Sequence, residues 1–185
     1  MNESPADRHR RVAAAFTATV EATPEAAWDD PAPPQGWVAR DVVRHLVEWF
    51  PAFLEGATGI TLRSGPSVDD DPVGAWRTQT AAVQALLDDP AIAERVEELP
   101  HLGTMSVGEA IDRIYTGDVF LHRWDLARAT GQDETLDPLM CGQMLEAMLP
   151  MDEALRHSGH YGPRVEVPDD ADVQTQLLAF IGRTP

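Results

Sequence analysis

Apolar residues recur at three- and four-residue intervals along most of the chain, which is the spacing of one face of an α-helix. Short stretches rich in proline, glycine and aspartate separate these segments and are typical of loops. The pattern predicts main helices over residues 6–22, 38–56, 71–87 and 106–130, a fifth from residue 137, and a short last helix from residue 173. Residues 92–104 show no clear periodicity, and Val96, Leu99 and Leu102 favour an extended stretch or a small hairpin there. We therefore predict an all-α fold, a four-helix bundle with short accessory helices.

Proline and glycine predict where several of these helices begin and end. Proline fits the first position of a helix, and Asp or Thr directly before it can cap that helix. Three such pairs predict helix starts: Thr23-Pro24, Asp71-Pro72 and Asp137-Pro138. Gly131 is a natural stop for the helix over 106–130, and Pro150 should kink the fifth helix. No repeat or long linker divides the chain, so we predict one domain over residues 1–185.

The composition is typical of a soluble, cytoplasmic protein. The chain has 185 residues, and 43% of them are hydrophobic. It contains neither an apolar run near the roughly 20 residues that span a bilayer nor an apolar signal segment after Met1. The net charge is -17, from 31 acidic residues against 14 lysines and arginines. Such a surface repels nucleic-acid phosphates and anionic membranes, so we expect neither as a partner.

The only cysteine, Cys141, cannot form an internal disulfide, which suits a reducing compartment. Its thiol could act as a nucleophile or a metal ligand. No histidine or aspartate stands beside it in the sequence, however, and buried free cysteines often serve only in packing. We favour the packing role.

The helix over 106–130 carries charged residues on its apolar face. With about 100° of rotation per residue, Asp118, His122 and Asp125 fall within the stripe that also holds Tyr115 and Leu126. A buried carboxylate needs a partner. A cation bound by Asp118 and His122, which are four residues apart and hence one turn apart, would supply one. A salt bridge between these two residues, or one to an arginine such as Arg44, is the alternative.

The helix over 38–56 offers a third candidate ligand. His45 stands at the edge of its apolar face, with Val42 and Trp49 on one side and Asp41 and Glu48 on the other. Across a bundle, this imidazole could meet the pair formed by Asp118 and His122. From spacing alone, an ordinary packed histidine is the more frequent explanation.

Two segments resemble the ligand motifs of a known family. They are GWVARDVVRHL at residues 36–46 and GDVFLHRWDLARATG at residues 117–131, and the ending QLLAFIGRTP at residues 176–185 is similar as well. The family is that of actinobacterial metal-binding proteins related to the metal-binding domain of mycothiol-dependent maleylpyruvate isomerase. It lies within the DinB/YfiT-like superfamily of metal-binding four-helix bundles.

The resemblance implies a metal site made of His45, Asp118 and His122. Three features depart from the family. The isomerase has glutamate where this chain has Asp118, whose side chain is one methylene shorter. Many relatives have a cysteine before the glycine and tryptophan, where this chain has Gln35. The isomerase also carries a second, C-terminal domain.

Two histidines and one carboxylate would leave open positions on the ion, as in catalytic sites. The resemblance implies that such an ion activates the thiol of mycothiol. Our leading hypothesis is therefore a metal-dependent, mycothiol-using transferase or isomerase that acts on a small molecule. Asp125 and Glu48 are candidates to orient a ligand or to act as acid or base. Asp125 could instead pair with Arg128 or cap the backbone.

Two other functions stay open. The protein could bind or sense metal without catalysis, or it could be an interaction module with a relict motif. Zinc is the first choice of metal, and nickel, iron or manganese also suit nitrogen and oxygen ligands. A homodimer through bundle faces is compatible with the sequence. The remaining histidines do not have the spacing of ligands to this site: His9, His101, His157 and His160. Of these, His101 could line the mouth of the site.

Overall fold

The computed structural model describes residues 3–99, 103–159 and 161–185. The chain forms two compact units, Met1–Asp133 and Glu134–Pro185, and each is considered by itself. The all-α fold predicted from the sequence is confirmed, and so is the small hairpin. Among the described residues, no helix combines the length and the apolar character that crossing a bilayer requires.

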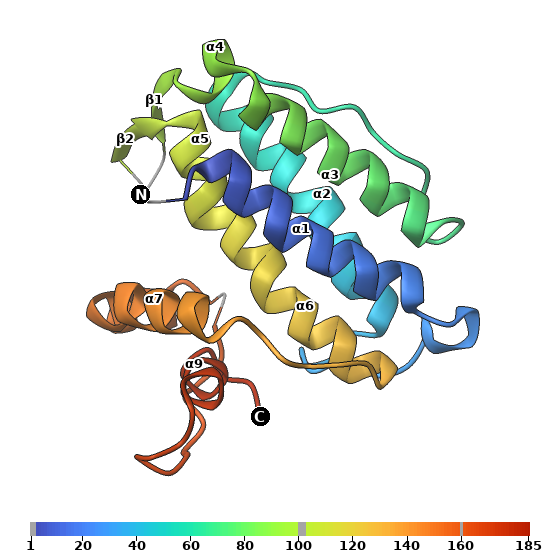
Figure 1. Ribbon diagram of the computed structural model, residues 1–185, viewed down its shortest axis with the longest axis vertical. Coiled ribbons are helices and arrows are strands. Elements are labelled where there is room, and N and C mark those ends of the chain that lie inside the picture. The colour runs from blue at the N-terminus through green and yellow to red at the C-terminus, as the bar shows by residue number, and fades with distance from the viewer. Residues whose placement is uncertain (1–2, 100–102, 160) are drawn as a thin grey trace. The chain divides into compact units, whose positions relative to one another are not determined.

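Four long helices run side by side in the first unit (Figure 1). They are α1 (Pro5–Ala22), α2 (Ala39–Thr58), α3 (Pro72–Asp88) and α6 (Gly117–Thr130). Both α1 and α2 pack against α3 and α6, so each of the four helices has two neighbours. Their apolar faces close on one core, whose largest fully buried side chains include Phe16, Leu46, Phe50, Trp76, Tyr115, Trp124 and Leu126.

Short elements connect these helices. A single 3-10 turn, η1 (Glu25–Ala27), follows α1, and α4 (Pro90–Ala93) follows α3. Strands β1 (Val96–Leu99) and β2 (Gly103–Ser106) pair antiparallel, with Val96 opposite Ser106 and Leu99 opposite Gly103. Leu102 and His101, which the sequence analysis singled out, lie outside the described residues.

Most of the predicted helix ends are confirmed, because they depend on local chemistry. The Asp71 carboxylate accepts a hydrogen bond from the Gly74 N–H at 2.8 Å, at the start of α3. Gly131 takes the left-handed conformation that ends α6. The prediction at Thr23 was wrong. Its hydroxyl donates back to the Thr19 carbonyl oxygen at 2.9 Å, so it closes α1 rather than capping a new helix.

The single helix predicted over 106–130 is divided into three segments. A short helix, α5 (Val107–Ala110), leads into a π-helical segment, η2 (Ile111–Thr116), and then into α6. A π-helix closes wider turns than an α-helix, and such segments are frequent at functional sites. This one ends one residue before Gly117, and the candidate ligand Asp118 comes next.

The second unit contains α7 (Pro138–Met148), the 3-10 turn η3 (Leu149–Met151), α8 (Asp152–His157) and α9 (Val173–Phe180). Helix α7 packs against α9. Pro150 was predicted to kink the fifth helix; it lies in the turn η3, which divides that segment into two helices, α7 and α8. Cys141 is fully buried on α7, and this burial raises the pKa of its thiol to about 11. A neutral, inaccessible thiol supports the packing role.

Candidate metal centre

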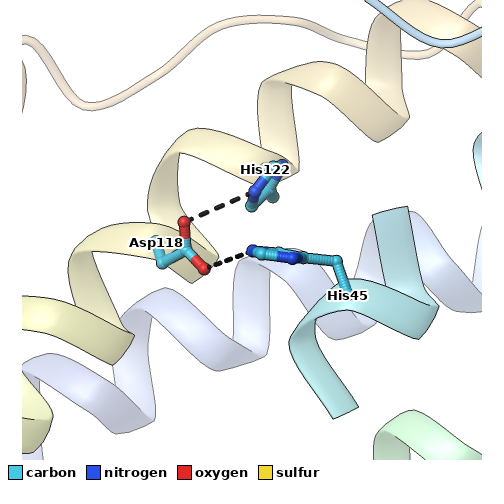
Figure 2. A group of neighbouring side chains, drawn as sticks. All are labelled: His45, Asp118 and His122. Carbon is cyan, nitrogen blue, oxygen red and sulfur yellow. Dashed lines mark hydrogen bonds and ion pairs between the residues drawn. The ribbon is translucent and has the colours of Figure 1, made fainter. Parts of the chain in front are cut away.

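Helices α2 and α6 bring His45, Asp118 and His122 together (Figure 2). The Nε2 atom of His45 lies 3.0 Å from Oδ2 of Asp118, and Nε2 of His122 lies 3.4 Å from Oδ1. One ligand atom from each of the three residues lies within 4.8 Å of the others. The two imidazoles thus approach one carboxylate from different helices.

The local sequence explains this placement. Asp118 and His122 are four residues apart on α6 and therefore share one face of that helix. Helix α2 starts where the Asp41 carboxylate accepts a hydrogen bond from the Val38 N–H at 2.9 Å. One turn later, His45 lies on the side of α2 that packs against α6. The side chains of His122, Asp118 and His45 are 8%, 23% and 31% exposed, so the cluster is deepest at His122.

Asp125 holds the second nitrogen of the His122 ring. Its Oδ2 atom lies 2.8 Å from Nδ1 of His122, and its side chain is only 1% exposed. A neutral imidazole that donates its Nδ1–H to a carboxylate leaves the lone pair on Nε2. In His122, that lone pair then points to the side where Asp118 and His45 lie. This pairing corresponds to the orienting role considered for Asp125 from the sequence.

Two tryptophans border the cluster, and sequence reasoning assigned neither of them to the site. The indole Nε1–H of Trp49 donates to Oδ2 of Asp118 at 3.0 Å. The Trp37 ring stacks on His122 with centroids 5.7 Å apart and lies 5.2 Å from the His45 ring. The position of Trp49, one turn past His45 on α2, was the signal that could have revealed it.

Glu48 lies away from the three side chains. Its carboxylate is 67% exposed and lies 4.0 Å from Nε of Arg44. Arg44 itself pairs with Asp41 and Asp69. An acid or base role for Glu48 therefore stays a prediction, without a contact to the cluster.

Opposite charges stabilise the cluster in the absence of a metal. Burial by itself would raise the pKa of Asp118, but the His122 and His45 imidazoles outweigh it and hold that pKa below its usual range. Burial by itself would lower the pKa of His122, but the carboxylates of Asp118 and Asp125 raise it above its usual value. In the absence of a metal, a protonated His122 thus supplies the positive charge that balances the neighbouring carboxylates, as a bound cation would.

The donor set fits a divalent ion. Ligand atoms that each lie about 2 Å from one ion are separated by about 3 to 4 Å. The two contacts between imidazole and carboxylate already fall in this range, at 3.0 and 3.4 Å. All three ligand atoms lie within 4.8 Å of one another, close to the separation that a shared ion requires. Two nitrogens and a carboxylate suit zinc and several other first-row metals.

The other histidines that the structure describes lie elsewhere. His9 is buried in α1, where its Nδ1 atom lies 3.0 Å from the Thr116 hydroxyl. His157 is exposed at the end of α8, with Nδ1 2.7 Å from the Glu153 carbonyl oxygen. His101 and His160 fall outside the described residues.

Comparisons with known proteins identify the family. The family model of the mycothiol maleylpyruvate isomerase N-terminal domain matches residues 9–127, a segment that contains His45, Asp118 and His122. Uncharacterised proteins from two strains of Mycobacterium tuberculosis, CDC 1551 and H37Rv, are each 28% identical to the chain over 189 residues. Each match covers 97% of this chain and 98% of the relative. No solved structure matches the chain. Since the family model spans more than half of its length, the chain belongs to the mycothiol maleylpyruvate isomerase N-terminal domain family.

Proposed function

We propose that the protein binds one divalent metal ion through Nε2 of His45, the carboxylate of Asp118 and Nε2 of His122. The observation that carries this proposal is the convergence of three ligand groups from two helices within 4.8 Å. The contact between Asp125 and His122 supports it, because metal-bound histidines commonly donate their other N–H to a carboxylate. Zinc is the first choice, and nickel, iron or manganese also fit the donors.

We further propose that the site serves a metal-dependent transferase or isomerase that uses mycothiol. Three protein ligands leave coordination positions open, and an ion with open positions lowers the pKa of a bound thiol or water. Asp125 orients His122, while the Trp37 ring lies against both imidazoles and the Trp49 ring lies near that of His45. The family description, which names mycothiol, supports a thiol as the small-molecule partner. A cytoplasmic location, where thiols stay reduced, suits this chemistry.

A metal-binding or metal-sensing role without catalysis is the alternative. One observation favours it: the proposed ligands come from α2 and α6, so an ion would link two helices of the first unit. Such a link stabilises the folded state over the unfolded one in proportion to the logarithm of the metal concentration. That effect would suffice for a sensor or a store.

The first test is the metal content of the purified protein, together with a zinc titration of a chelator-treated sample. We expect about one equivalent per chain. His45→Ala and His122→Ala should each abolish stoichiometric binding, because each removes one of three ligands. His157→Ala is the matched control and should bind like the wild type, because His157 lies at the exposed end of α8.

Two results would contradict the proposal. Full affinity in His45→Ala would mean that the ligand set is wrong, and Asp125 or Glu48 would be the next candidates. Absence of binding in the wild-type protein would remove the metal site altogether.

A second titration separates the enzyme from the sensor. Cobalt(II) bound to a thiolate gives a charge-transfer band in the near ultraviolet. We expect this band to appear when mycothiol is added to the cobalt-loaded wild-type protein. If cobalt binds but mycothiol leaves the spectrum unchanged, the metal-binding or sensing role is favoured instead.

A further inference from the structure

Trp49 makes a hydrogen bond to the proposed ligand Asp118, and this bond has no part in the function proposed above. Its Nε1–H donates to Oδ2 of Asp118 at 3.0 Å, and the same oxygen lies 3.0 Å from Nε2 of His45. An indole nitrogen only donates, so Trp49 cannot itself bind a cation through this atom. Its contact with the carboxylate therefore acts on the orientation of Asp118.

We propose that Trp49 is a positioning residue that makes Asp118 bind the ion through a single oxygen, Oδ1. This inference rests on the proposed metal site. When His45 binds an ion through Nε2, it gives up its hydrogen bond to Oδ2, and the indole is the donor that stays on that oxygen. Oδ1, which lies 3.4 Å from Nε2 of His122, is then the oxygen free to ligate.

The consequence concerns the open side of the ion. A carboxylate with two unengaged oxygens can bind a metal through both of them and thereby fill an extra coordination position. Hydrogen bonds to ligating carboxylates fix their geometry and contribute to metal affinity. By holding Oδ2, Trp49 keeps one position available for a thiol or water.

The surroundings of Trp49 make a conservative variant feasible. Its ring contacts the rings of Phe50, Phe53 and Tyr115, with centroids 5.5 to 6.1 Å apart. Trp49→Phe keeps an aromatic ring in this cluster and removes the N–H. Trp76→Phe is a matched control, because it likewise removes an indole N–H, which Trp76 on α3 donates to the Thr17 hydroxyl at 2.8 Å, outside the candidate site.

The experiment is a titration of the metal-free full-length proteins with cobalt(II) alone, followed by visible absorption. Four-coordinate cobalt absorbs more strongly than cobalt with five or six ligands. We expect Trp49→Phe to lose about 10- to 100-fold in affinity and to show weaker absorption per bound ion, as Asp118 turns to bind through both oxygens. Trp76→Phe should keep the wild-type spectrum and lose less than about threefold in affinity. A purely structural role of Trp49 would lower the melting temperature and leave the spectrum of the bound ion unchanged.

The outcomes distinguish this inference from the metal site itself. If the wild-type protein binds cobalt and Trp49→Phe matches it in affinity and spectrum, the positioning role is overturned and the metal site stands. If the wild-type protein binds no cobalt, both are overturned. Should Trp49→Phe fail to fold, proton NMR of zinc-loaded wild-type protein provides the test. The Trp49 indole N–H should exchange slowly with solvent, and exchange at the rate of an exposed indole would overturn the proposal.

Discussion

Both nitrogens of the His122 imidazole face carboxylates. Asp125 lies 2.8 Å from Nδ1, and Asp118 lies 3.4 Å from Nε2. Asp125 is the more deeply buried of the two acids, and a buried carboxylate without a partner would destabilise the fold. The sequence pattern placed both acids on the buried face of one helix. It could not decide whether Asp125 meets His122 or an arginine, since that depends on side-chain rotamers.

We predict that Asp125→Asn weakens zinc binding about 10- to 100-fold while the fold is retained. An asparagine amide can donate to Nδ1 of His122, which would move the ring proton to Nε2 and block the ligating atom. A competition titration with a zinc chelator measures the affinity. Glu48→Gln is the control on the neighbouring helix, and its exposed carboxylate predicts wild-type affinity. Wild-type affinity in Asp125→Asn would remove the orienting role.

His9 links the stability of the fold to pH. Its ring is fully buried in α1, 5.9 Å from the Tyr115 ring. Burial and, to a smaller extent, the nearby Arg10 lower the pKa of His9 to about 4, against the opposing effect of Asp88. In the unfolded chain, His9 becomes protonated as the pH falls below about 6.5. In the folded protein, it stays neutral until the pH approaches about 4. The stability due to neutral His9 is therefore complete above pH 6.5 and is lost as the pH falls through this window.

From this shift we predict that His9 accounts for about 2 kcal/mol of the stability lost between pH 7.5 and pH 5. Urea unfolding of the metal-free protein at the two pH values measures the loss. In His9→Asn the loss of stability between the two pH values should be smaller by about that amount, because the asparagine side chain does not bind a proton in this pH range. An equal loss in the variant and the wild type would show that other groups carry the pH dependence.

At the scale of elements, the sequence predicted those features that local chemistry determines. Asp71-Pro72, Gly131 and Pro150 each act within one turn of the chain, and the structure agrees with all three. Thr23 was assigned to the wrong helix because a hydroxyl can accept at a helix start or donate at a helix end. The π-helical segment η2 could not be predicted, because the apolar spacing follows the 3.6 residues per turn of an α-helix and does not reveal a local widening.

The candidate site divides in the same way. Asp118 and His122 were predicted as a pair because a spacing of four residues within one helix brings side chains together. The meeting of His45 with that pair depends on how α2 packs against α6, which no local pattern encodes. The prediction that His45 joins this pair came from the resemblance to a family instead. The contact between Trp49 and Asp118 depends on the same packing, and neither the sequence pattern nor the resemblance predicted it.

At the scale of the whole molecule, the net charge of the chain and the proposed site both favour the binding of a cation. The chain carries a net charge of -17, and its potential attracts cations and repels anions. A divalent cation bound by the partly buried Asp118 carboxylate, with the buried Asp125 carboxylate behind His122, would offset part of this charge where desolvation is costly. Binding to the folded state alone would then stabilise the first unit, which contains all three proposed ligands.

The single domain proposed for residues 1–185 can be tested by calorimetry of the full chain. The second unit, Glu134–Pro185, is short, and small units bury too little surface to be stable on their own. We therefore predict one unfolding transition, with equal calorimetric and van't Hoff enthalpies, that moves to higher temperature as zinc is added. The His122→Ala protein should show one transition that zinc does not move. Two transitions, of which zinc moves only one, would contradict the single domain. They would leave the metal site intact and assign it to the unit whose transition responds.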